Sequence, residues 1–295
     1  MYRENPGQRK KAKKNNHQKL INSNMIILSY ITWDVGPELF NIGPFSVRWY
    51  GLLFAMAFIV GFKIMQWMYK RENKPESDVE QLTVYMIVGT VIGARLGHCL
   101  FYNPEYYFAN PLEILMVWKG GLASHGASIG ILISLYVYTK KKKVSFLWQM
   151  DRVVVATALG GSFIRLGNLF NSEIIGKAAD VPWAFIFTKV DNVPRHPTQL
   201  YESLGYLVIF LILFFIYKNK YKVLNDGFIF GLFLFLLFTF RIIVEFFKEN
   251  QTGFEEGMAF NMGQLLSVPF VILGVILIVR SLKKNKNVTP AKISK

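Results

Sequence analysis

The chain has 295 residues, of which 52% are hydrophobic and only 18% are charged. Soluble domains carry about 25% charged residues, and several apolar runs here approach the roughly 20 residues that cross a bilayer. Because these runs are continuous and do not alternate with polar residues, they favour transmembrane helices over a β-barrel. Most of the net charge of +15 lies in the tails and short loops, which suits an anionic membrane surface and argues against a nucleic-acid partner.

The N-terminal region precedes the first apolar run. Residues 1–24 hold seven Lys and Arg residues and no apolar period, so we expect a disordered basic extension. Met25 begins a segment that would itself serve as an N-terminus, which makes a mis-assigned start an open alternative. Residues 25–47 contain several Gly and Pro residues. These exclude a straight spanning helix and predict an interfacial, partly helical entry.

Seven apolar segments follow, and we expect each to form a transmembrane helix. Their approximate ranges are 49–69, 82–101, 120–139, 144–170, 203–217, 227–247 and 262–279. The predicted fold is therefore an all-α, polytopic membrane protein. A seven-helix transmembrane domain covers residues 25–282, and residues 283–295 form a basic tail.

The distribution of basic residues between loops predicts the orientation of these helices. The connections at 70–74, 140–143 and 218–222, with the tail after 279, hold sixteen Lys and Arg residues. The opposite set of connections holds only five. Since basic loops stay in the cytoplasm, we expect the C-terminus inside and the N-terminus outside. The basic residues before Met25 conflict with this orientation, so either they are absent from the mature protein or later helices overrule them.

Basic side chains lie at one depth in four of the predicted spans. In this orientation Arg95, His125, Arg165 and Arg241 all fall beneath the outer surface. Polar groups in hydrocarbon are costly unless they have partners or a task. One such arginine could simply reach the headgroups, but four helices with basic groups at one level favour a shared cavity. Guanidinium groups suit phosphate oxygens, so we expect a site for a lipid headgroup.

The chemistry of such a cavity is narrowed by what the sequence lacks. The carboxylates Glu173, Glu202 and Glu245 are scattered without metal-ligand spacing, which disfavours metal-assisted phosphoryl transfer. A base, several cations and an anionic leaving group remain, which suffice for a nucleophilic displacement of phosphate. Arg241 and Glu245 share a helix face, so a simple ion pair between them is the alternative.

Several stretches together resemble one family, the prolipoprotein diacylglyceryl transferases. They occur in the family's order over about residues 40–280: Ile42-Gly43-Pro44, Arg48-Trp49-Tyr50-Gly51, Gly93-Ala94-Arg95-Leu96-Gly97, Val117 to Gly126, Arg165 to Glu173 with Gly176, Arg195 to Glu202, Phe240 to Phe247 and Met262-Gly263-Gln264. The family usually has glycine where Ala127 follows Gly126, and often tyrosine where Leu237 stands. These departures affect fine geometry and leave the proposed base and both phosphate-binding arginines in place.

The resemblance implies a multi-pass enzyme of the bacterial inner membrane with its N-terminus outside. Its implied reaction transfers the diacylglyceryl group of phosphatidylglycerol to the lipobox cysteine thiol in the signal peptide of a preprolipoprotein. Glycerol phosphate leaves, and no metal or organic cofactor is expected. The implied partners are phosphatidylglycerol, the signal peptide and membrane lipids.

The resemblance also assigns residues to roles. His125 is the implied base for the thiol, or else it organises the site. Arg165 and Arg241 are the implied catalytic and phosphate-binding cations. The further substrate-binding positions that it implies are Tyr50, Asn168, Glu173, Gly176, Glu245 and Arg95.

Two alternatives remain open on the sequence. A lipid transporter or flippase with an outer-leaflet phosphate site is the competing function, although no internal repeat is visible. A receptor-like seven-helix protein is weaker, since no lysine lies within the seventh span. The long connection from 177 to 195 either receives the signal peptide or gates product release, or it forms a structural cap.

Overall fold

The computed structural model describes residues 30–43, 45–250, 258 and 260–285. The expected disordered extension, residues 1–24, lies outside this range, as does the tail after residue 285. The chain divides into two compact units. The described part of the smaller unit comprises residues 30–34 and 177–196, and the larger unit holds the rest.

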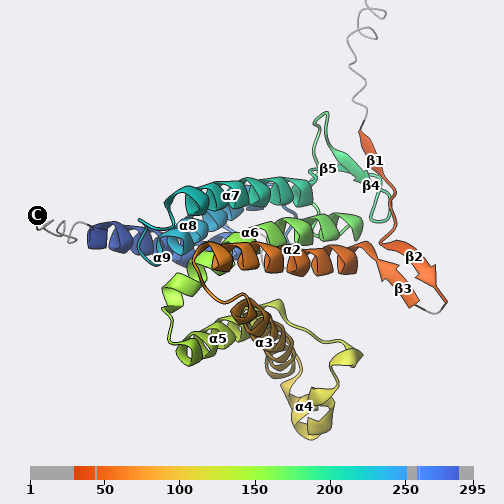
Figure 1. Cartoon of the computed structure of the whole chain (residues 1–295). Coiled ribbons are helices and arrows are strands. Elements are labelled where there is room, and N and C mark those ends of the chain that lie inside the picture. The colour runs from red at the N-terminus through yellow and green to blue at the C-terminus, as the bar shows by residue number, and fades with distance from the viewer. Residues whose placement is uncertain (1–29, 44, 251–257, 259, 286–295) are drawn as a thin grey trace, which may run out of the picture. The chain divides into compact units, whose positions relative to one another are not determined.

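Helices dominate the larger unit (Figure 1). The described α-helices are α2 (Trp49–Arg71), α3 (Ser77–Phe101), α4 (Pro104–Ala109), α5 (Ser124–Lys142), α6 (Phe146–Phe170), α7 (Thr198–Lys220), α8 (Phe228–Glu245) and α9 (Met262–Asn285), with short 3-10 turns η1 (Pro111–Leu115) and η2 (Val117–Lys119).

Each of the seven predicted spans corresponds to one of these helices. Six are long and apolar enough to cross a membrane, namely α2, α3, α6, α7, α8 and α9. The predicted third span, α5, is not in this set, because small residues and three lysines fill much of its 19 residues. α7 begins at Thr198, five residues before the predicted Ser203. The prediction followed apolar residues, whereas the first turn of α7 is polar and nevertheless buried.

The described structure is mostly helical, as the sequence predicts, with a few short strands added. In residues 30–43 and 45–47, strands replace the partly helical entry that the sequence predicts for residues 25–47. β2 (Glu38–Ile42) pairs antiparallel with β3 (Phe45–Arg48), and α2 starts at the next residue. The turn between these strands contains Gly43 at φ 57°, a left-handed conformation that favours glycine. Gly43, one of the residues that argue against a straight spanning helix, thus lies in the turn of a hairpin.

Helix α6 lies at the centre of the larger unit. It packs against α2, α7 and α8 (Figure 1), and the buried side chains of these helices form one continuous apolar core. Ser145 caps its N-terminus by accepting a hydrogen bond from Trp148 N at 3.2 Å. Asp151, near the same end, accepts from Gly227 N at 2.8 Å and Phe230 N at 2.7 Å, which fixes the start of α8.

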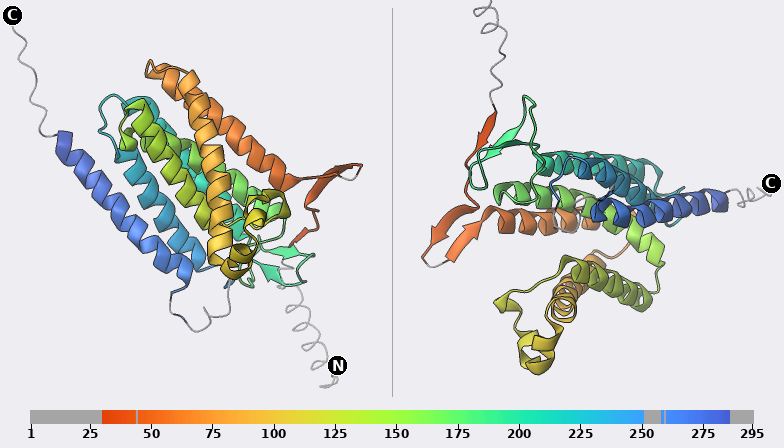
Figure 2. Two further views of the ribbon diagram at one scale, coloured as in Figure 1. Left: turned by 90° about the horizontal axis from the view of Figure 1, so that it is seen from below. Right: turned by 180° about the vertical axis from the view of Figure 1, so that it is seen from behind.

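Glycines set the two closest helix pairs, α3 with α5 and α8 with α9 (Figure 2). A Cβ on Gly97 of α3 would lie 2.7 Å from Gly126 Cα of α5. Gly231 of α8 and Gly274 of α9 face each other in the same way. Because small residues allow backbones to approach in a membrane, these glycines determine how closely the helices pack.

The smaller unit is a three-stranded sheet. β1 (Ile31–Trp33) pairs parallel with β4 (Phe185–Phe187), which pairs antiparallel with β5 (Pro194–Arg195). Asp191 and Arg195 form an ion pair at 2.6 Å that lowers the pKa of the Asp191 carboxyl. The long connection from 177 to 195 is therefore built around a strand pair.

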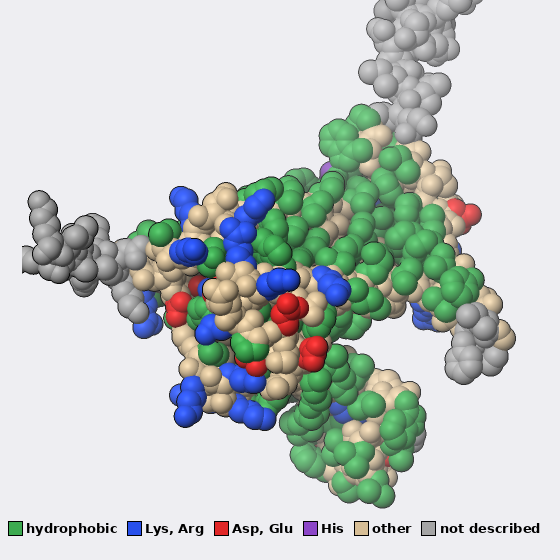
Figure 3. Space-filling view, in the orientation of Figure 1, with side chains coloured by type: hydrophobic (Ala, Val, Ile, Leu, Met, Phe, Trp, Pro, Cys, Tyr) green, Lys and Arg blue, Asp and Glu red, His purple; other side chains and the backbone are tan. Residues whose placement is uncertain are grey.

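Basic side chains gather at one end of the larger unit (Figure 3). They lie over the region where α2 and α7 finish and where α5 joins α6, whereas the sides of the long helices are covered by hydrophobic side chains. An apolar flank beside a basic end is typical of a membrane protein.

Candidate functional site

The last turns of α6 and the segment after it carry the first part of the site. Arg165 Nη1 donates to Asn168 Oδ1 at 3.2 Å, and Asn168 Nδ2 donates to Glu173 Oε1 at 2.6 Å. The backbone around Glu173 is held by Gln199, whose Nε2 donates to Glu173 O at 2.7 Å. Three of the predicted residues are thus joined in one hydrogen-bonded chain.

The turn that follows α6 is held in an unusual conformation. Ser172 and Ile174 have φ values of 53° and 56°, in the left-handed region that non-glycine residues rarely adopt. Thr198 Oγ1 donates to Ile174 O at 2.9 Å, and Gly176 forms an isolated bridge with Lys248. These bonds place the predicted residue Gly176 beside the segment that leaves α8.

Buried charges form the centre of the site. Glu202, in the second turn of α7, is 0% exposed. Its carboxylate lies 3.0 Å from Arg165 Nε and 2.9 Å from Lys248 Nζ. Lys248 Nζ also lies 3.0 Å from Glu245 Oε2. Buried ions require partners of opposite charge, so Lys248 balances carboxylates from both α7 and α8.

Arg241 differs from the other cations of this cluster. Its Nε is buried and has no hydrogen-bond partner among the described residues. Tyr206 of α7 interacts electrostatically with both Arg165 and Arg241, and its ring centroid is 6.0 Å from Arg165 Cζ. The ion pair of Arg241 with Glu245, the alternative allowed by their spacing, is absent from the described ion pairs, where Glu245 pairs with Lys248 instead.

The charges of this cluster are not evenly paired. Arg165 and Lys248 pair directly with Glu202 and Glu245, and Glu173 is joined to Arg165 through Asn168. Arg241 forms no ion pair among the described residues. A buried cation with an unpaired donor favours an anionic ligand.

Tyr50 lies at the same site from the start of α2. Its ring packs against Gly167, where a Cβ would lie 2.7 Å from Tyr50 Cδ2. Tyr50 interacts electrostatically with Glu173 and Arg165. The absence of a side chain at Gly167 therefore allows the Tyr50 ring to reach the hydrogen-bonded chain of α6.

His125 does not join this network in the structure. It is the second residue of α5 and its side chain is exposed. Among the described residues, no hydrogen bond or ion pair connects His125 with Arg165 or Arg241. No direct contact joins His125 to the two arginines within the described residues, because α5 packs mainly against α3. The shared cavity that the sequence predicts stays a prediction.

Arg95 lies in the α3–α5 part of the structure, away from the contacts described for Arg165. It is 3% exposed, and its guanidinium donates to the backbone carbonyls of Glu113, Ile114, Gly120 and Gly121. Its Cζ lies 5.0 Å from the Tyr107 ring centroid. These bonds commit Arg95 to holding the segment that leads into α5 and His125, which favours a positioning role over contact with substrate.

Three residues of the cluster were missed as site residues by the sequence reasoning: Glu202, Tyr206 and Lys248. The spacing of Glu202 to Tyr206 and of Glu245 to Lys248 was visible, since residues three or four apart share a helix face. The pairing of Glu202 with Lys248 was not visible, because it joins residues 46 apart in the sequence.

Comparison with known proteins places this site in a family. A sequence profile described as prolipoprotein diacylglyceryl transferase matches residues 37–280. A phosphatidylglycerol–prolipoprotein diacylglyceryl transferase of Chloroherpeton thalassium is 49% identical over 257 residues, which is 87% of this chain and 96% of the relative. Proteins of the same name from Tolumonas auensis and Bacteroides fragilis are 46% and 48% identical. They match 85% of this chain and 98% and 95% of their own lengths. The chain therefore belongs to the prolipoprotein diacylglyceryl transferase family.

Proposed function

We propose that this protein transfers the diacylglyceryl group of phosphatidylglycerol to the cysteine thiol of a preprolipoprotein lipobox, the first step of lipoprotein maturation. The names of the relatives support the reaction and its two substrates. In the structure, the observation that carries the proposal is the buried, unpartnered donor of Arg241 beside the paired cation Arg165. This arrangement fits the phosphate of a lipid headgroup.

The cations of the site favour a nucleophilic displacement in which the phosphate is the leaving group. The sulfur attacks the glyceryl carbon that bears the phosphate, the new S–C bond forms, and the C–O bond breaks with its electron pair on the phosphate oxygen. Glycerol phosphate leaves. Arg241 stabilises the charge that builds on this oxygen, while Arg165, fixed by Glu202 and Asn168, orients the phosphate.

A base is needed for the thiol, whose free pKa is about 8.5. His125 is the proposed base, and its exposed position on α5 leaves the imidazole accessible to an incoming peptide. Tyr50, Asn168, Glu173, Gly176 and Glu245 complete the proposed substrate site through the contacts described above. Arg95 acts on the same site by fixing the segment before α5.

The proposed topology has seven membrane crossings: the six long apolar helices and, in addition, α5. The N-terminal side then lies outside and the C-terminus in the cytoplasm, as the Lys and Arg distribution favours. The proposed location is the bacterial inner membrane, where the site faces the outer leaflet and the signal peptide reaches it from the membrane.

A direct assay tests the proposal. Purified protein, phosphatidylglycerol and a lipobox peptide should yield a thioether-linked lipid, detected by mass spectrometry. His125→Asn should lower kcat by about 100-fold or more, the contribution typical of a general base, while phosphatidylglycerol still binds. Movement of phosphatidylglycerol across vesicles with no thioether product would favour a flippase, and a near-normal rate for His125→Asn would remove this residue as the base.

A further inference from the structure

A second charged cluster lies at the opposite end of the helices that build the site. α2 (Trp49–Arg71) carries Tyr50 at its first end and Arg71 at its last. α6 (Phe146–Phe170) carries Trp148 near its first end and Arg165 near its last. At 1.5 Å per residue, the ends of α2 are roughly 30 Å apart, which matches the roughly 30 Å hydrocarbon core of a bilayer. The second cluster therefore lies at the headgroup layer of the other leaflet.

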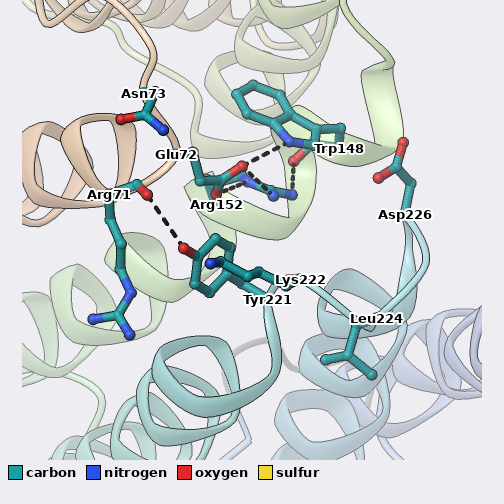
Figure 4. Close-up of a pocket in the computed structure, with 9 residues that line it drawn as sticks. All are labelled: Arg71, Glu72, Asn73, Trp148, Arg152, Tyr221, Lys222, Leu224 and Asp226. Atoms are coloured by element: carbon teal, nitrogen blue, oxygen red, sulfur yellow. Dashed lines mark hydrogen bonds and ion pairs between the residues drawn. The ribbon is translucent and has the colours of Figure 1, made fainter.

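This cluster surrounds a pocket of about 320 Å³ (Figure 4). The pocket lies where α2 ends, α6 begins and the chain passes from α7 to α8. It is lined by Arg71, Glu72, Asn73, Trp148, Arg152, Tyr221, Lys222, Leu224 and Asp226.

One part of the lining is electrically neutral and fully bonded. Arg152 donates to both carboxylate oxygens of Glu72, at 2.9 and 2.8 Å. Trp148 Nε1 and the Tyr217 hydroxyl donate to the same carboxylate at 3.1 and 2.6 Å. Glu72 therefore neutralises the charge of Arg152, and this hydrogen-bonded pair forms one side of the pocket.

Two further cations have no such partner. Arg71 Cζ and Lys222 Nζ lie 5.3 and 5.8 Å from the centroid of the Tyr221 ring. Neither forms an ion pair within the described chain, and the Arg71 side chain donates a hydrogen bond to Lys218 O at 2.9 Å. Asp226 is the remaining carboxylate of the lining and lies on the far side of the view from Arg71 (Figure 4).

We propose that this pocket binds a phosphate group, supplied by an anionic phospholipid of the leaflet opposite the catalytic site. Arg71 and Lys222 leave the lining with a net positive charge after Glu72 and Asp226 are counted. Basic pockets between helix ends bind anionic headgroups, and the surrounding surface is also basic (Figure 3). The inference goes beyond the proposed function, because these residues lie at the other ends of α2, α6 and α7. Inorganic phosphate shares the recognised chemistry and is a test arm.

The chain offers a matched pair of variants. Arg71→Gln with Lys222→Gln removes both free cations of the pocket. Lys70→Gln with Lys220→Gln removes the same charge from exposed neighbours on α2 and α7 that do not line it. Each purified full-length protein is titrated in neutral detergent with dioctanoyl phosphatidic acid, dioctanoyl phosphatidylcholine or inorganic phosphate, and bound equivalents are counted by native mass spectrometry.

The wild type and the control variant should bind one more equivalent of phosphatidic acid than the pocket variant. In the pocket variant, the affinity of this pocket for phosphatidic acid should fall at least tenfold. Binding of phosphatidylcholine should be equal in all three. Loss of inorganic phosphate binding without loss of the lipid would assign the pocket to a soluble phosphate. Equal binding of both anions by the pocket and control variants would overturn the proposal.

Transferase activity is measured on the same preparations, so a failure of the pocket and a failure of the proposed reaction are distinguishable. Because Arg71 also lies 5.3 Å from the Trp67 ring centroid, Lys222→Gln alone, matched by Lys220→Gln, repeats the test without disturbing that contact. Activity in every one of these variants should stay near that of the wild type.

Discussion

At the scale of single residues, the site depends on how its cations are shared. Arg165 and Lys248 are held by Glu202, whereas Arg241 keeps a buried donor without a partner. The carboxylates therefore do more than neutralise charge: they fix two cations in place and leave the third to meet a ligand. This division predicts different consequences for substitutions that look equivalent in sequence.

Arg241→Lys should lower kcat for diacylglyceryl transfer by about 100-fold, the order seen when a donor to a developing oxyanion is removed. The charge is kept, but an ammonium group cannot present the planar pair of donors that suits phosphate. Steady-state kinetics with phosphatidylglycerol and a lipobox peptide measures the effect, with Arg48→Lys as a control outside the charged cluster. A silent Arg241→Lys variant would contradict the phosphate-binding role.

Lys248→Met should destabilise the protein by about 3–5 kcal/mol, because it leaves the buried Glu245 without its cation and Glu202 with Arg165 alone. Lys248 is 4% exposed and pairs with both Glu202 and Glu245. Thermal unfolding in detergent measures the loss, and Lys248→Arg should recover part of it by restoring the charge. If Lys248→Met melted like the wild type, the network would not hold these helices together.

At the scale of elements, close glycine contacts position His125. Gly126 follows it directly in α5 and lies against the backbone of α3. Arg95 donates hydrogen bonds to backbone carbonyls of the segment before α5 and so holds that segment in place. The imidazole thus stands on a helix whose distance from α3 and whose entry are both set by neighbouring residues.

Gly126→Ala should destabilise the α3–α5 pair by about 1–3 kcal/mol, the usual cost of overpacking, and should reduce activity by moving His125. A Cβ there would lie 2.8 Å from Gly97 Cα. Gly61→Ala is the matched control, since its Cβ would lie 3.6 Å from Ala156 Cβ, an ordinary contact. Thermal unfolding and transfer rate are measured for both variants, and equal behaviour would show that α5 tolerates displacement.

At the scale of the whole molecule, the orientation of the helices decides which leaflet supplies the substrate. The proposed topology places residues 102–119 and 177–196 outside and residues 140–143 inside. α5 then crosses the membrane although its composition is the least apolar of the seven. The glycine contact with α3 provides a protein surface for it.

Single cysteines in a Cys99→Ala background test this topology. Leu112→Cys and Lys189→Cys should react with a membrane-impermeant maleimide in intact spheroplasts, whereas Lys141→Cys should react only after permeabilisation. Cys99 itself is buried, so its removal changes no accessible thiol. Labelling of Leu112→Cys and Lys141→Cys from the same side would show that α5 does not cross, and the reverse pattern would invert the orientation.

The sequence by itself determined where the long helices lie and which of them carry basic residues. Hydropathy and length are local properties, so the starts of α2, α6, α8 and α9 were predicted within two residues of those observed. The observed α3 begins five residues before its predicted start. Hairpin β2–β3 was missed because Gly and Pro residues mark a break in a helix without specifying what replaces it.

Only the tertiary structure decided which charged groups meet. Glu202 pairs with Lys248, and Arg165 joins them from α6, whereas His125 and Arg95, at a similar predicted depth, belong to the α3–α5 pair. Depth along a helix can be read from residue number, but the rotation of each helix and the choice of its neighbours arise from packing between segments far apart in the chain. Those two quantities decide which of the residues at one level contact one another.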